Sequence, residues 1–179
     1  MTIRREDVKE LYSKEQIQEK IKEMGQQITE QYSGSKAPLH MVCVLKGSVH
    51  FFSDLLLSIE ADVNYSFIQV ASYKGTASSG RINVKSWIDE PIQDKNVIVV
   101  EDILDTGRTL KYILNYLSRY KPATLEVATL VDKYEKEHFG ITPKYVGFET
   151  KDRFLLGYGL DFDQKFRNLP FIGYVDAGD

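Results

Sequence analysis

The fold of this chain is indicated most clearly by one run of thirteen residues, Val97-Ile98-Val99-Val100-Glu101-Asp102-Ile103-Leu104-Asp105-Thr106-Gly107-Arg108-Thr109. Its four β-branched apolar residues, 97–100, are typical of a fully buried strand inside a parallel sheet. Two adjacent carboxylates, a short Asp-Thr-Gly-Arg-Thr loop and a helical pattern follow this strand. Hydroxyls, a glycine and backbone N–H groups at a strand-to-helix turn predict a site for one phosphate group.

The acidic pair Glu101-Asp102 stands directly before this predicted phosphate site. Carboxylates repel a phosphate, so their position indicates a ligand that places a diol or a divalent metal between the acids and the phosphate. A ribose 5-phosphate that carries Mg²⁺ meets this description. The alternative is a buried strand that ends in a solvated acidic turn. The loop 105–109 favours the first interpretation.

This segment resembles the signature of the type I phosphoribosyltransferases, which bind phosphoribosyl pyrophosphate (PRPP). The resemblance implies that Glu101 and Asp102 address the ribose hydroxyls and the metal. It also implies that the 5-phosphate is held by the loop residues Asp105, Thr106, Gly107, Arg108 and Thr109. Asp105 is the candidate catalytic residue, a general base that takes or shares a proton at N7 of a purine. Its alternative role is to cap the helix that starts at Gly107.

Two further segments match the family at the ends of other predicted strands. Leu45, Lys46 and Gly47 correspond to the loop that binds pyrophosphate, in which the peptide equivalent to Leu45-Lys46 can be cis. Lys133 matches the lysine that 6-oxopurine transferases direct at the exocyclic oxygen of the base, which would disfavour adenine. If the resemblance is set aside, the segment 45–47 is interpreted as an ordinary turn and Lys133 as a surface lysine.

Other matches involve a loop and the C-terminal part of the chain. Ser72 and Tyr73 match a Ser-Tyr pair on a loop that closes over the reacting centre, and the small polar residues that follow predict a mobile loop. The segment 145–161 is similar to the purine-binding hood of the hypoxanthine-guanine phosphoribosyltransferases. The resemblance assigns base stacking to Phe154, base-edge contact to the Leu155 backbone, a second Mg²⁺ to Asp161 and pyrophosphate to Arg167. The alternative is plain core for Phe154 and Leu155 and a turn residue at Asp161.

The remaining patterns predict strands that alternate with helices. A capping box at Ser13 and Gln16 starts a helix that runs to about Tyr32. Further helices are expected through 51–59 and 110–117, and strands over 39–45, 65–72, 83–87, 97–100 and 124–131. Such alternation predicts an α/β fold, a parallel sheet flanked by helices. We expect a single domain over 1–179 with the type I phosphoribosyltransferase fold and a small hood subdomain, formed mainly after about residue 145.

Composition excludes several classes of protein. The 179 residues carry a net charge of −3 with both signs interspersed, which disfavours a nucleic-acid partner. We expect no membrane segment and no signal peptide, because no apolar run is long enough and the first residues are polar. The single cysteine, Cys43, excludes an internal disulfide and favours a cytoplasmic location. The three histidines lack the spacing of a zinc site.

The resemblance implies a purine salvage enzyme that transfers the phosphoribosyl group of PRPP to N9 of hypoxanthine or guanine and requires Mg²⁺. It also implies a homodimer or homotetramer. Two alternatives stay open: a non-enzymatic regulator that binds PRPP or nucleotides, and a transferase for xanthine or a pyrimidine. A dinucleotide-binding protein is disfavoured, because no Gly-x-Gly-x-x-Gly follows a strand.

Overall fold

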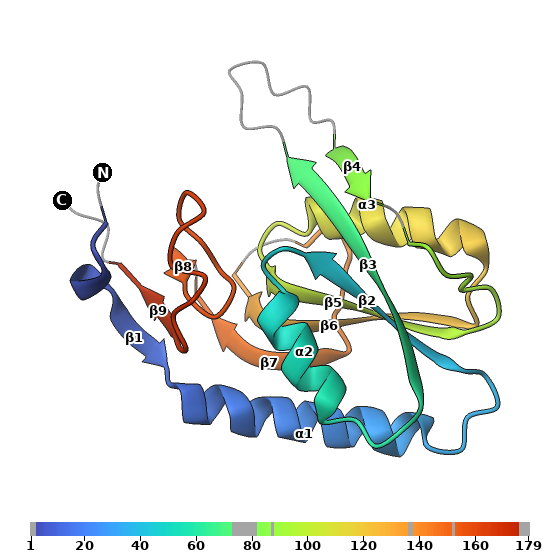
Figure 1. Ribbon diagram of the computed structural model, residues 1–179. Coiled ribbons are helices and arrows are strands. Elements are labelled where there is room, and N and C mark those ends of the chain that lie inside the picture. The colour runs from blue at the N-terminus through green and yellow to red at the C-terminus, as the bar shows by residue number, and fades with distance from the viewer. Residues whose placement is uncertain (1–2, 73–81, 87, 136–137, 152, 176–179) are drawn as a thin grey trace.

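A computed structural model describes residues 3–72, 82–86, 88–135, 138–151 and 153–175. Its centre is a six-stranded sheet of order β4-β3-β2-β5-β6-β7 (Figure 1). Neighbouring strands are parallel except for β3 and β4, which are antiparallel. The strands are β2 (Leu39–Leu45), β3 (Val63–Ser72), β4 (Ile82–Ser86), β5 (Asn96–Leu104), β6 (Thr124–Lys133) and β7 (Tyr145–Thr150). The predicted α/β fold is therefore confirmed.

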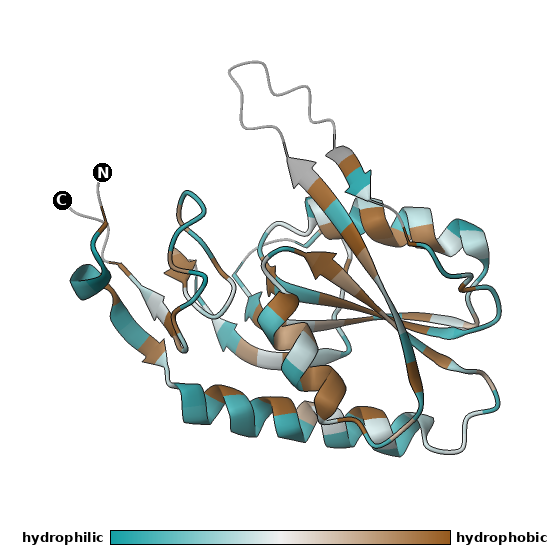
Figure 2. Cartoon of the chain, viewed as in Figure 1, coloured by the Kyte–Doolittle hydropathy of each residue, from teal (hydrophilic) through white to brown (hydrophobic). Residues whose placement is uncertain are grey.

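Helices cover both faces of this sheet. The helices α1 (Lys14–Tyr32) and α2 (Val49–Leu57) pack on one face, where they share a core with the buried residues of β2 and β5 that point toward them. The helix α3 (Arg108–Leu117) and the short 3₁₀ turn η2 (Ser118–Tyr120) follow β5, and α3 packs into a second core on the other face. Figure 2 shows apolar residues concentrated along the central strands. No described helix is long and apolar enough to cross a membrane.

Some predicted boundaries are confirmed, and others are corrected by a few residues. The capping box of Ser13 and Gln16 starts α1, and β2 has the predicted bounds. The central strand does not end at Val100, because β5 continues to Leu104 alongside β6, which runs to Lys133. Glu101 and Asp102 therefore lie inside a strand and not in a turn after it. The helix α2 ends at Leu57 and not at Ile59.

A second, smaller sheet stands beside the carboxyl edge of the central one. It is antiparallel, of order β1-β9-β8, and pairs β1 (Lys9–Tyr12) with β9 (Ile172–Tyr174) and β9 with β8 (Leu155–Leu156). We call this sheet, with the segment 157–171, the hood. The strand β7, which the family resemblance groups with the hood, joins the central sheet instead. The N-terminal strand β1, preceded by the 3₁₀ turn η1 (Arg5–Asp7), is not anticipated by the sequence analysis.

A fully buried histidine lies in β2. His40 Nε2 is 3.0 Å from Ser66 Oγ, and His40 Nδ1 has no hydrogen-bond partner among the described residues. Burial, followed by the charge of Lys95, lowers the pKa of His40 from 6.5 to about 4. The folded chain thus holds this imidazole neutral where an unfolded chain would protonate it.

We expect acid to destabilise the protein through His40. Because the folded pKa is the lower one, this contribution to stability is complete above pH 6.5 and is lost as the pH falls toward 4. The free energy of unfolding should fall by up to about 3 kcal/mol over this range. Urea denaturation at pH 7.5 and pH 4.5 measures the loss, and His40→Leu should reduce it. An equal loss in the variant and the parent would contradict the assignment to His40.

Candidate functional site

Three of the predicted segments meet at one edge of the central sheet. The strands β2, β5 and β6 are mutually parallel neighbours, so the residues that follow them emerge together at their carboxyl ends. This edge receives the loop 45–48 after β2, the loop 105–109 after β5 and Lys133 at the end of β6. Ligands of open α/β sheets bind in this position.

The loop after β2 is packed directly against the acids of β5. Its Leu45-Lys46 peptide is cis, the isomer that the sequence could not reveal. A Cβ atom on Gly47 would collide with the carboxylate of Asp102, so only glycine fits there. The Lys46 side chain is exposed, whereas Ser48 is buried and donates its hydroxyl to the carbonyl of Val44. This loop therefore presents an exposed lysine, and the backbone of Gly47 lies against the carboxylate of Asp102.

The acidic pair lies in a desolvated position. Burial raises the pKa of Asp102, although hydrogen bonds to its carboxylate oppose the shift, among them one from the backbone N–H of Ile103 at 2.9 Å. Burial and the neighbouring Asp102 together hold the pKa of Glu101 well above its usual value. Glu101 Oε2 has no hydrogen-bond partner among the described residues. A cation or hydroxyl donors between these oxygens would relieve the repulsion.

The loop after β5 turns the chain into α3. Gly107 is the N-cap of α3 with φ +74°, and a Cβ atom there would lie 2.9 Å from the carbonyl oxygen of His138. The N-cap position of α3 is thus Gly107, two residues after Asp105. Thr106 and Arg108 are exposed and Thr109 is half-buried at the start of α3, where N–H groups favour an anion. Arg108 also lies over the ring of Phe139, 5.9 Å from its centroid.

Asp105 and Lys133 face each other across the ends of β5 and β6. Lys133 Nζ is 3.8 Å from Asp105 Oδ1; the lysine side chain is 9 % exposed and the aspartate 45 %. The ring of His138 supports this arrangement from behind: Nε2 is 3.0 Å from the carbonyl oxygen of Lys133, and Nδ1 is 3.4 Å from Asp132 Oδ1. From the sequence, His138 was tested only as a zinc ligand, and the spacing of the histidines disfavoured that role. No local pattern could have revealed that it supports Lys133.

The hood reaches the same edge through its tight turns. Arg167 Nη2 is 2.7 Å from Asp161 Oδ1, and Arg167 Nη1 donates to the carbonyl of Gly159 at 2.6 Å. A Cβ atom on Gly159 would overlap the carbonyl oxygen of Gly47, so the hood and the loop after β2 are in backbone contact. Asp161 and Arg167 therefore lie on the turn that contacts the 45–48 loop.

The two remaining hood residues differ in exposure. Phe154 is 49 % exposed and meets the ring of Phe162 edge-on, with centroids 5.7 Å apart. Leu155 is buried and pairs with Tyr174 of β9. An exposed ring beside a fixed backbone segment has the form of a stacking platform, and the plain core expected in the alternative interpretation does not apply to Phe154.

One pair of predicted site residues falls at the edge of a segment that the structure does not describe. Ser72 ends β3 and its side chain is outside the described residues, as are Tyr73 and the rest of the predicted mobile loop.

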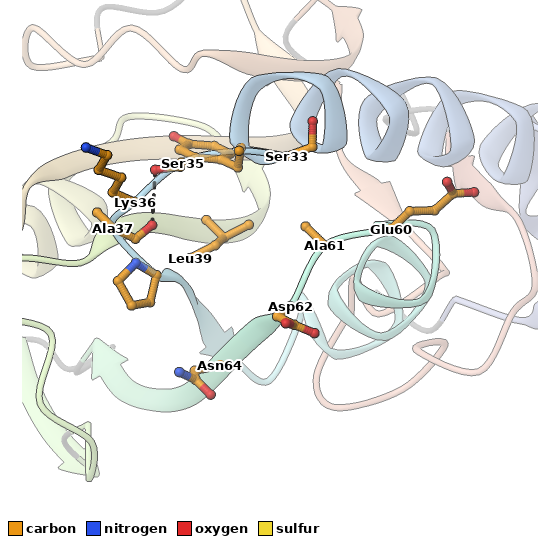
Figure 3. A pocket seen from close by; sticks show the side chains of 12 residues that line it. Ser33, Ser35, Lys36, Ala37, Leu39, Glu60, Ala61, Asp62 and Asn64 are labelled. Atoms are coloured by element: carbon orange, nitrogen blue, oxygen red, sulfur yellow. Dashed lines mark hydrogen bonds between the residues drawn. The ribbon is translucent and has the colours of Figure 1, made fainter.

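The cavity of about 420 Å³ in Figure 3 lies between residues 33–39 and 60–64, at the amino ends of β2 and β3. It is at the opposite edge of the sheet from the acids, and the hydrogen bond between Ser35 and Ala37 drawn there belongs to a chain turn.

The sequence was compared with known protein families and curated proteins. Residues 7–163 match the family named phosphoribosyl transferase domain. A hypoxanthine-guanine phosphoribosyltransferase of Streptococcus thermophilus is 43% identical over 171 residues, which is 94% of each chain. A hypoxanthine-guanine-xanthine phosphoribosyltransferase of Tritrichomonas foetus is 42% identical over 166 residues, covering 92% of this chain and 90% of that protein.

Solved structures give the same result. A hypoxanthine phosphoribosyltransferase from Staphylococcus aureus superposes with a TM-score of 0.88 at 41% identity, covering 95% of this chain and 92% of that one. A hypoxanthine-guanine phosphoribosyltransferase from Bacillus anthracis superposes with a TM-score of 0.85 at 43% identity, covering 94% and 98%. At these identities and coverages the likeness extends to the family as well as to the fold.

Proposed function

This chain belongs to the phosphoribosyl transferase family, and from that premise we propose that it is a purine salvage enzyme. The reaction transfers the 5-phosphoribosyl group of PRPP to N9 of hypoxanthine or guanine and releases IMP or GMP with pyrophosphate. The names of the relatives support hypoxanthine and guanine as the accepted bases, and the name of one relative also includes xanthine.

The observation that carries the proposal is the meeting of Asp105 with Lys133, 3.8 Å apart at the carboxyl edge of the sheet. A 6-oxopurine presents an acceptor, O6, next to N7, which carries a proton in one tautomer. A lysine donates and a carboxylate accepts, so the pair complements this edge of the base. Adenine presents a donor at position 6 and would leave the Lys133 ammonium facing another N–H group.

The reaction then follows from the positions of these side chains. N9 of the N7-protonated base attacks C1 of the ribose, the bond from C1 to pyrophosphate breaks, and Asp105 accepts the N7 proton. Lys46 and Gly47, with Leu45, hold the pyrophosphate, and Arg167 adds a positive charge near it. The 5-phosphate rests on Thr106, Gly107, Arg108 and Thr109 at the start of α3.

The acids of β5 fit Mg²⁺. They are adjacent oxygen donors in a desolvated position, with one oxygen of Glu101 lacking a hydrogen-bond partner among the described residues. Mg²⁺ is commonly held by one or two carboxylates together with substrate phosphates and water. When bound, the ion neutralises the leaving pyrophosphate. Glu101 and Asp102 would hold it with the ribose hydroxyls, and a second ion at Asp161 would compete with Arg167 for that carboxylate.

The base and the reacting centre would be enclosed by further residues. Phe154 stacks on the purine and the backbone of Leu155 contacts its edge. We assign to Ser72 and Tyr73 the exclusion of water from the reacting centre, which would protect an oxocarbenium-like ribosyl group from hydrolysis. The proposal also includes a cytoplasmic location and a homodimer or homotetramer; light scattering of the purified chain measures the latter.

A nucleotide-formation assay tests the proposal. PRPP and Mg²⁺ are supplied with hypoxanthine, guanine, xanthine, adenine or uracil in turn. We expect turnover of hypoxanthine or guanine and none of adenine, loss of turnover in excess EDTA, and recovery on addition of MgCl₂. Binding of PRPP without turnover of any base would identify a regulator instead. Turnover confined to xanthine or uracil would identify a related transferase.

Lys133→Ala is expected to weaken purine binding more than PRPP binding. The variant removes a charged donor to O6, which is typically worth about 1.5–3 kcal/mol, so the KM for hypoxanthine should rise roughly 10- to 100-fold. The KM for PRPP should change only a few-fold. Steady-state kinetics with each substrate varied in turn measures both, and Lys144→Ala, on the opposite edge of the sheet, is the control. An unchanged KM for hypoxanthine would remove Lys133 from the base site.

A further inference from the structure

Tyr158 ties the hood to the two helices beneath it. Its hydroxyl donates to Asp54 Oδ2 on α2 at 2.5 Å, and the same oxygen accepts from Gln18 Nε2 on α1 at 2.6 Å. The side chain is buried, and burial followed by the hydrogen bond to Asp54 raises the pKa of Tyr158. The phenol therefore stays protonated and keeps donating to Asp54.

The backbone of this residue is held in an unfavourable conformation. Tyr158 has φ +48°, which is an outlier for a bulky side chain and persists only where surrounding contacts hold it. Its N–H donates to the carbonyl of Leu169 at 2.9 Å. The phenol and the N–H thus hold the turn at both ends.

This turn contacts Arg167 and the 45–48 loop, the residues assigned to pyrophosphate in the proposed function. The next residue, Gly159, donates its N–H to the carbonyl of Arg167 at 2.9 Å and accepts from Arg167 Nη1 at 2.6 Å. Its Cα lies against the carbonyl of Gly47 so closely that no Cβ fits. A displacement of Tyr158 would therefore move Arg167 and the 45–48 loop together.

We propose that Tyr158 and Asp54 are positioning residues for the pyrophosphate group of PRPP. This inference rests on the proposed function. Neither residue is among the proposed substrate contacts: Tyr158 is buried, and Asp54 lies on α2, where it accepts from Tyr158. They act through Gly159, which sets the guanidinium of Arg167 and the backbone of Gly47. Asp105 and Lys133, which contact the purine in the proposed function, are not part of this chain of contacts.

Binding of two ligands that share a ribose 5-phosphate tests the pyrophosphate half and the purine half of the site separately. PRPP carries the pyrophosphate and IMP carries the base, and titration calorimetry with Mg²⁺ measures the Kd of each. We expect Tyr158→Phe to raise the Kd of PRPP about tenfold, the size of a lost hydrogen bond to a charged group. The Kd of IMP should stay within about twofold, because IMP lacks the pyrophosphate.

Variants of Asp54 separate positioning from general stability. Asp54→Ala should raise the Kd of PRPP as much as Tyr158→Phe does, and the double variant should raise it no further. Asp54→Asn should keep the Kd of PRPP near that of the parent chain, because its amide oxygen still accepts the hydrogen bond from Tyr158. Tyr116→Phe removes a comparable hydroxyl, which is 2.6 Å from that of Tyr120 on the outer side of α3, and serves as the matched control. It should leave both Kd values unchanged.

Three results would overturn the inference. Equal weakening of PRPP and IMP in Tyr158→Phe would indicate a structural role only, as would a lowered Tm with unchanged PRPP affinity. Additive losses in the double variant would show that the two residues act separately. Failure of the parent chain to bind PRPP would instead refute the proposed function, and the inference with it.

Discussion

Replacement of Asp105 by asparagine is expected to lower kcat by roughly 10²- to 10⁴-fold, the contribution of one well-placed general base. The amide keeps the shape of the carboxylate but cannot take the N7 proton. The KM for PRPP should change only a few-fold, because the 5-phosphate is bound by the hydroxyls and N–H groups of the loop. Steady-state kinetics with hypoxanthine and PRPP varied separately distinguishes the two effects.

Because Asp105 also forms an ion pair with Lys133, the effect of the substitution is not confined to kcat. Asp105 is 3.8 Å from a lysine that is almost buried, and asparagine removes the negative charge of Asp105 from this ion pair. Some increase in the KM for hypoxanthine is therefore expected alongside the loss in kcat. Asp62→Asn, at the exposed amino end of the sheet, is the matched control. Equal losses in kcat and in PRPP affinity would mean that Asp105 mainly shapes the loop.

Features governed by neighbouring residues were predictable from the sequence. The capping box at Ser13 starts α1 because its two hydrogen bonds join residues three apart. The run 97–100 forms a buried strand because four consecutive β-branched side chains need burial on both faces. Because β2, β5 and β6 are parallel, their following residues meet at one edge. The candidate residues after these strands could therefore be grouped before the structure was known.

Features that depend on distant segments were not predictable. The strand β1 gains its place from pairing between Lys9 and Tyr174, at opposite ends of the chain, and four residues of sequence carry too little pattern to show it. The extension of β5 to Leu104 depends on the length of β6. The bond between Tyr158 and Asp54 joins the hood to α2 across more than half of the chain, and it has no local signal in the sequence.

The contact between the hood and the 45–48 loop makes Gly159 a position where a single added methyl group should be strongly destabilising. At φ +101° any L side chain is strained, and the added Cβ would overlap the carbonyl oxygen of Gly47. Strain of about 1–2 kcal/mol and overpacking of about 1–3 kcal/mol together predict that Gly159→Ala lowers the free energy of unfolding by about 2–5 kcal/mol. Urea denaturation measures this loss.

The same substitution should reduce activity further than stability alone explains. Relief of the overlap requires the loop or the hood to move by about 1 Å, and a misplacement of that size costs on the order of 10²-fold in rate. Gly34→Ala separates strain from collision: Gly34 has φ +117° but nothing within 4 Å of an added Cβ. That control should lose only the strain energy and keep its kcat/KM for PRPP. If both variants lose activity equally, the contact between Gly159 and Gly47 does not set the geometry of the site.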